Sequence, residues 1–198
     1  EPIQLIEHIA RIVVLLDEQK LQEADVLLPE LLAHPAWGIA PEELWKLSIK
    51  AYDQRHRWLD TMATIPFFLP FQTWLITMAK EAQHQPVEYM LDRIIGTAHP
   101  PATTQVVTAD DDPFASDEKP TLDFQSPLYD YFFSKASLEI NADAYLTYLE
   151  GLRTIRSALR DYQLDESPTL ATFVSFIDLY KRLGGTLTST RRPSDHTP

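Results

Sequence analysis

Apolar residues recur at every third or fourth position near the start of the chain, and this spacing limits the possible folds more than any other feature. The positions that share this spacing are Ile3, Ile6, Ile9, Ala10, Val13, Val14 and Leu16. Such a period is typical of an amphipathic helix. No run of alternating residues with hairpin turns suggests strands. The sequence therefore predicts an all-α fold, an irregular multi-helix domain.

Prolines and glycines mark the ends of the predicted helices. Pro41 occupies a favoured first helical position and is followed by two acids that suit the positive end of the helix dipole. From this helix we expect four residues to point inward: Leu44, Leu47, Ala51 and Tyr52. The segment 26–33 repeats the apolar pattern, and Pro29 is tolerable there only near the first turn.

Five more helices are predicted further along the chain, at 68–83, 86–95, 127–134, 141–162 and 168–183. Three prolines fit the first helical position, namely Pro86, Pro127 and Pro168. Asn141 is suited to cap the amino end of a helix, and Gly96 and Gly184–Gly185 are suited to end one.

Two segments break the helical pattern. Residues 97–125 are rich in proline and acid, which predicts a mobile acidic loop that only Phe114 and Phe124 are able to anchor. Residues 186–198 are predicted to be a polar linker or tail. The loop divides the chain into helical stretches at 1–96 and 126–185. We expect both to share one core, which makes 1–185 one helical unit.

The composition excludes several classes of protein. The 198 residues carry a net charge of −12, unlike a basic nucleic-acid module, and include no cysteine for disulfides or thiolate chemistry. No apolar run is long enough to span a bilayer, so we expect no membrane partner and a cytoplasmic location. Because the sequence begins with Glu1, we expect a fragment or a processed chain.

Motifs for catalysis and for metal binding are missing. The sequence has no phosphate-binding GxxxxGK[ST] loop, no HExxH and no GxSxG. The triplet 110–112 of aspartates lacks the spacing of a calcium loop, so we interpret it as a solvated charge run. We therefore expect no catalytic residue, no metal and no cofactor in this chain.

Basic residues are few but grouped. Lys46 and Lys50 are four residues apart on the helix that follows the turn Trp37–Gly38–Ile39, and a second group comprises Arg153, Arg156 and Arg160. Lysines and arginines near a glycine turn suit contact with phosphate. These eight residues are therefore the candidates for contact with phosphate. The alternative is an ordinary solvated surface with local ion pairs.

The order of these segments resembles a known family. LLPELLAHPAWGIAPEELWKL is followed by YLTYLEGLRTIRSALRDY and then by SPTLATFVSFIDLYKRLG and STRRPSD. This order is similar to the 2B subdomain, the accessory helical insertion of UvrD/Rep/PcrA and RecB-like superfamily 1 DNA helicases. The similarity covers roughly 1–96 and 141–195.

The resemblance implies a regulatory subdomain of an ATP-dependent DNA helicase. Its partners would be duplex or forked DNA ahead of the fork and the remaining helicase domains, with ATP and magnesium bound elsewhere in the parent protein. The resemblance makes the eight phosphate-contact candidates the candidate DNA-binding set. In this chain Ala40-Pro41 and Glu42-Glu43 stand where many members have a glycine and basic neighbours. The alternative function is a helical scaffold for protein–protein interaction.

We predict that this chain alone hydrolyses no nucleotide, because it contains no phosphate-binding loop and no paired acid and base. Phosphate release from ATP with magnesium should stay at the level of a buffer blank. Turnover that a point substitution within the chain abolishes would contradict this prediction.

Overall fold

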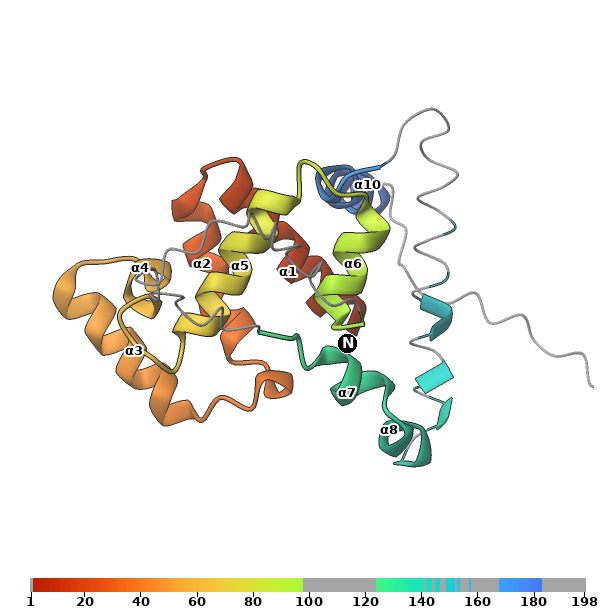
Figure 1. Cartoon of the computed structure of the whole chain (residues 1–198), viewed down its shortest axis with the longest axis horizontal. Helices are drawn as coiled ribbons and strands as arrows, with labels where there is room; N and C mark the ends of the chain where they lie inside the picture. The colour runs from red at the N-terminus through yellow and green to blue at the C-terminus, as the bar shows by residue number, and fades with distance from the viewer. Residues whose placement is uncertain are drawn as a thin grey trace, which may run out of the picture.

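The computed structural model describes residues 2–97, 124–140, 142–143, 145–146, 149–151, 153, 157 and 168–182. Every regular element in these ranges is a helix, which confirms the predicted all-α class (Figure 1). The first half of the chain forms α1 (Pro2–Asp17), α2 (Leu21–Leu32), the 3-10 turn η1 (Pro35–Trp37), α3 (Pro41–Gln54), α4 (Trp58–Met62), α5 (Leu69–Glu81) and α6 (Val87–Ile95). The remaining helices are α7 (Leu128–Phe133), α8 (Lys135–Ile140) and α10 (Leu170–Arg182).

Helix α1 lies at the centre of the molecule. It packs against α2 and α5 on one side and against α6 and α10 on the other (Figure 1). Residues around most of its circumference are buried, among them Ile6, Ile9, Ile12 and Val13. A helix that is apolar on nearly all sides is stable only when other elements surround it. Helix α1 is therefore the element on which the other helices assemble.

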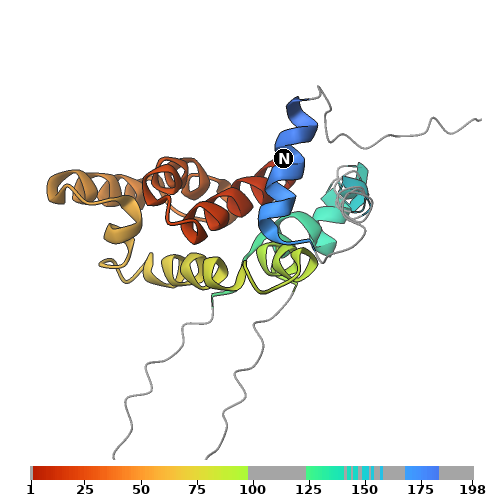
Figure 2. The ribbon, with the colours of Figure 1, turned by 90° about the horizontal axis from the view of Figure 1, so that it is seen from above.

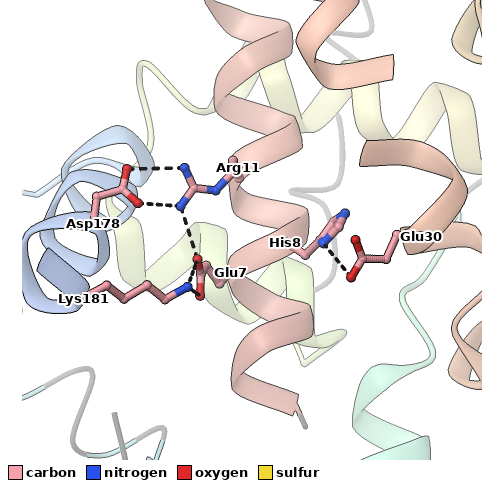
Figure 3. Close-up of polar contacts among 6 residues, drawn as sticks. All are labelled: Glu7, His8, Arg11, Glu30, Asp178 and Lys181. Atoms are coloured by element: carbon pink, nitrogen blue, oxygen red, sulfur yellow. Dashed lines mark hydrogen bonds and ion pairs between the residues drawn. The ribbon is translucent and has the colours of Figure 1, made fainter. Parts of the chain in front are cut away.

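An ion-pair network joins α1 to α10 (Figure 3). Arg11 on α1 donates from Nη2 and Nη1 to the two carboxylate oxygens of Asp178, over 2.6 and 3.3 Å. Arg11 Nη2 also donates to Glu7 Oε1 over 3.2 Å. Lys181 donates from Nζ to both oxygens of Glu7, over 2.6 and 2.8 Å. Arg11 and Lys181 thus both pair with Glu7, and this pairing offsets the cost of burying its carboxylate between α1 and α10.

A cluster of four aromatic rings packs between η1 and α5. The Trp37 ring centroid lies 4.8 Å from that of Phe71, 6.2 Å from Trp74 and 6.4 Å from Phe124. Phe124 also lies 5.3 Å from Phe71 and 5.4 Å from Trp74. Phe124 therefore anchors its segment on the core, as its apolar character predicted. Nε1 of Trp37 is buried, and no acceptor for it lies among the described residues.

Several helix ends differ from the prediction by a residue or two. Pro86 and Pro127 cap their helices from outside, so α6 begins at Val87 and α7 at Leu128. Helix α10 begins at Leu170, after Thr169, whose hydroxyl accepts from the backbone N–H of Thr172. A threonine side chain supplies the acceptor that the first turn needs, whereas Pro168 cannot.

Two sequence predictions are wrong. Pro29 lies inside α2, which begins five residues before the expected start at Val26. The burial of Ala24, Leu28 and Leu31 offsets the cost of a proline in the helix interior, which is about 3 kcal/mol. Tyr52 was expected to point inward but is 84% exposed. Helix α3 packs mainly against α4, and only a narrow face of it, with Leu47 and Ala51, is buried.

Other predictions fall on residues that the structure does not describe. They concern most of the acidic loop 97–125 with Phe114, the cap at Asn141, the stop at Gly184–Gly185 and the tail 186–198. Within the predicted helix 141–162, the residues that the structure describes are helical. No described helix has both the length and the apolar character needed to cross a bilayer.

We predict that Asp178→Asn weakens the fold in a pH-dependent way. The hydrogen bond from Arg11 lowers the pKa of Asp178 below its ordinary value of 3.8. The carboxylate therefore stabilises the fold fully above that value, and the stabilisation is lost as the pH falls through the lowered pKa. Because 39% of the Asp178 side chain is exposed, the loss at pH 7 should be about 1 kcal/mol or less.

Urea unfolding of both proteins between neutral pH and pH 2 would test this. The difference in unfolding free energy should shrink below pH 3.8. Asp53→Asn is the matched control, because Asp53 has no ion-pair partner in the described part of the chain. A difference between wild type and Asp178→Asn that stays constant over the whole range would contradict the assignment.

We further predict that Trp37→Ala costs about 3 kcal/mol of unfolding free energy, as removal of a large aromatic from a core does. Trp37→Phe keeps a ring in the cluster and removes the unpartnered indole N–H, so its cost should stay below about 1.5 kcal/mol. The exposed Trp45→Ala should change stability by about 0.5 kcal/mol or less. Equal losses for Trp37→Ala and Trp37→Phe would show that ring packing is not the cause.

Candidate nucleic-acid interface

The candidate turn Trp37–Gly38–Ile39 is held in place by the residues before it. The backbone N–H of Ala36 donates to Nδ1 of His34 over 3.1 Å, and that of Trp37 donates to the carbonyl of His34 over 3.1 Å. Burial lowers the pKa of His34, which favours the neutral ring that can accept this bond. The His34 ring also packs against Tyr131 and Phe132, at centroid distances of 6.0 Å. Helix α7 thus supports the turn.

Gly38 reverses the chain between η1 and α3. Its φ is +61°, in the left-handed region, and its N–H donates to the carbonyl of Pro35 over 3.0 Å. A Cβ at this position would meet no atom within 4 Å, so backbone conformation, and not lack of space, favours glycine here. The open space beside Gly38 leaves its backbone accessible to a large partner.

Trp37 and Ile39 face the core on either side of this glycine. Both are half-buried and pack against the main apolar cluster. Their side chains therefore fix the direction in which α3 leaves the turn. The backbone around Gly38, and not the Trp37 ring, is the part of this turn that lies open to a ligand.

The amino end of α3 is acidic. Ala40 provides no side-chain cap, Pro41 is the first helical residue, and Glu42 and Glu43 follow in the first turn. A helix amino terminus favours an anion, but two carboxylates at this one already supply that negative charge. Phosphate binding directly at this terminus is therefore opposed by Glu42 and Glu43.

The two candidate lysines on α3 differ in their surroundings. Nζ of Lys46 donates to Oε1 of Glu43 over 2.6 Å, and this bond raises the pKa of Lys46. Lys46 is nevertheless well exposed, so a phosphate could compete with Glu43 in solvent. Lys50 is half-buried and has no ion-pair partner in the described ranges. Both lysines lie on the helix that follows the turn, Lys46 about 7.5 Å and Lys50 about 13.5 Å along its axis from Pro41.

The arginine group lies elsewhere. Arg153 is exposed on a helical segment, while Arg156 and Arg160 lie outside the described residues. Figures 1 and 2 place α3 and the segment around Arg153 at opposite ends of the long axis. Nearby, Gly151 is buried against Ile3 of α1, where a Cβ would collide with the isoleucine side chain. Arg153, the described member of the arginine group, therefore does not share one continuous surface with the lysines of α3.

An exposed apolar face on α3 was not predicted from the sequence. Three side chains on α3 are largely exposed, namely Trp45 (70%), Ile49 (51%) and Tyr52 (84%). The spacing of these residues, four and then three positions apart, could have predicted the face, because it places all three on the side of the helix opposite Leu47 and Ala51. Beside Tyr52 an open cleft of about 600 Å³ is lined by Ser48, Ala51, Asp53, Arg55, His56 and Trp58.

The chain matches no protein-family model, and comparison with curated proteins and with solved structures finds no similar chain.

Proposed function

We propose that the chain is the accessory helical subdomain of a UvrD/Rep-like superfamily 1 DNA helicase. The observation that carries this proposal is that the separate segments of the resemblance share one core. Helix α2, which contains LLPELL, and helix α10, which forms LATFVSFIDLYKR of the last segment, lie far apart in the sequence and pack against the same helix, α1. Segments with no structural relation to one another would not be expected to converge in this way.

The joint between α1 and α10 supports an inserted subdomain. Lys181, in the last turn of α10, lies 2.6 Å from Glu7, which is only about 8 Å along α1 from Pro2 at 1.5 Å per residue. The amino end of α1 and the carboxyl end of α10 thus lie close together. Domains whose ends lie close together are tolerated as insertions in other domains.

In this proposal the subdomain performs no chemistry. ATP and magnesium act in the motor domains of the parent protein, and this unit would hold duplex or forked DNA ahead of the fork. Lys46 and Lys50 beside the Gly38 turn would provide phosphate contacts without sequence preference. Glu42 and Glu43 limit their strength, so affinity of the isolated chain should be no better than about 10⁻⁴–10⁻⁶ M at physiological salt.

A protein-interaction scaffold is the second candidate. The exposed face formed by Trp45, Ile49 and Tyr52 favours it, because tryptophan and tyrosine are enriched at protein interfaces. The two candidates differ in their response to salt. Phosphate binding weakens steeply as salt rises, whereas an apolar interface does not.

We predict that duplex binding, measured by fluorescence anisotropy at low salt, weakens in Lys46→Ala/Lys50→Ala and in Arg153→Ala/Arg156→Ala/Arg160→Ala. Loss of two phosphate contacts should reduce the slope of log K against log salt by about 2. Lys20→Ala/Lys80→Ala is the matched control, since it removes the same charge from α5 and from the residue before α2.

Binding that is unchanged in both groups of variants would refute these sites. If the control pair weakens duplex binding equally, the loss arises from the change in net charge and not from contacts at these sites. Absence of duplex binding, together with salt-insensitive binding to another protein, would favour the scaffold.

A further inference from the structure

The outer face of α3 carries three large apolar side chains that no described element covers. Trp45, Ile49 and Tyr52 lie within about 60° of each other around the helix, at 100° per residue. Figures 1 and 2 show α3 at one edge of the molecule, with no other drawn helix beyond it. Exposed apolar faces of this kind mark interaction sites.

The charges on α3 are arranged asymmetrically about this face. Glu42 lies near the amino end on the same side of the helix, and Arg55 follows the last helical residue. Neither forms an ion pair in the part of the chain that the structure describes. Asp53 is similarly unpaired, whereas Lys46 pairs only with Glu43 across an exposed surface. Lys50 lies at the edge of the face and is half-buried.

These positions are nearly symmetric about Ile49. Along the helix axis Trp45 lies about 6 Å before Ile49 and Tyr52 about 4.5 Å after it, at 1.5 Å per residue. Lys46 lies about 4.5 Å before it and Asp53 about 6 Å after it by the same rise, and both lie on the same flank of the face. An identical helix running in the opposite direction would therefore place Trp45 against Tyr52, Ile49 against Ile49 and Lys46 against Asp53.

We propose that two copies of this chain associate through antiparallel packing of α3 about a two-fold axis at Ile49. Each apolar side chain then meets an apolar side chain of the other copy, and the pair Lys46–Asp53 forms twice. The open cleft between Tyr52 and Trp58 receives the Trp45 indole of the second copy. A parallel arrangement would instead bring like charges together, so the charge pattern selects the direction.

The interface is small. Trp45 and Tyr52 are 70% and 84% exposed and Ile49 is 51% exposed, so these side chains bury roughly 600–900 Å² in the two copies together, below the range for specific interfaces of about 1,200 Å² and more. We therefore expect a weak dimer, populated at high micromolar concentration and dissociated at low micromolar concentration. This inference is independent of the helicase proposal.

Sedimentation equilibrium over a range of concentrations tests the inference directly. Wild type should move from the 22.7 kDa chain mass toward twice that mass as concentration rises. Ile49→Asp places a charge on the two-fold axis and should keep the chain monomeric. Val26→Asp is the matched control, since Val26 is an exposed β-branched residue on α2, away from the proposed interface, and the variant should dimerise as wild type does. Circular dichroism confirms that each variant is folded.

Charge reversal tests the direction of packing. Lys46→Glu and Asp53→Lys should each raise the dissociation constant of the dimer by about tenfold or more, because each change makes two like-charge contacts. The double variant Lys46→Glu/Asp53→Lys should recover association close to that of wild type. If the single variants failed only because they were less stable, the double variant would not recover association.

Several results would overturn the proposal. A wild-type chain that is monomeric at every concentration would do so, as would association that survives Ile49→Asp. A double reversal that fails to restore association would exclude this antiparallel register. Loss of duplex binding in Ile49→Asp without any change in mass would assign the face to DNA instead.

Discussion

The burial of α1 is the constraint on which the rest of the structure depends. Its isoleucines and valines point in nearly every direction, so α2, α5, α6 and α10 must surround it to remove that surface from water. Glu7 and Arg11 interrupt the apolar surface on the side toward α10, and they are satisfied there by Lys181 and Asp178. The contact between α1 and α10 is thus largely apolar, and its ion pairs fix how the two helices are oriented.

Helical periodicity predicted the class of fold and most helices, because burial on one face leaves a direct trace in the order of residues. It did not predict α4 or α8, which have only five and six residues and are too short to show a period. Tyr52 was misplaced because the width of a buried face depends on how many neighbours a helix has. The ion pairs between α1 and α10 join residues more than 160 positions apart, and nothing in the local sequence specifies such a pairing.

The candidate site was predictable in part. The glycine turn and the lysines were recognised from residue type and spacing, and the structure places both lysines on the helix that follows the turn. The exposed face of α3 was not recognised, because an apolar residue on a helix is usually a core residue. If α3 both contacts DNA and pairs with a second copy of itself, the two events compete. Lys46 would bind a phosphate in the DNA complex and Asp53 of the other copy in the dimer, so self-association would prevent this part of the chain from binding DNA.

The most direct test of the central claim is unwinding of a forked duplex by the full-length protein that contains this chain. ATP hydrolysis should be measured beside it, with the helical unit 1–185 present or replaced by a short linker. An accessory subdomain predicts that ATP hydrolysis persists without the unit, while the rate or extent of unwinding changes. Unwinding and hydrolysis that are both unaffected, or a full-length protein that hydrolyses no ATP, would contradict the account.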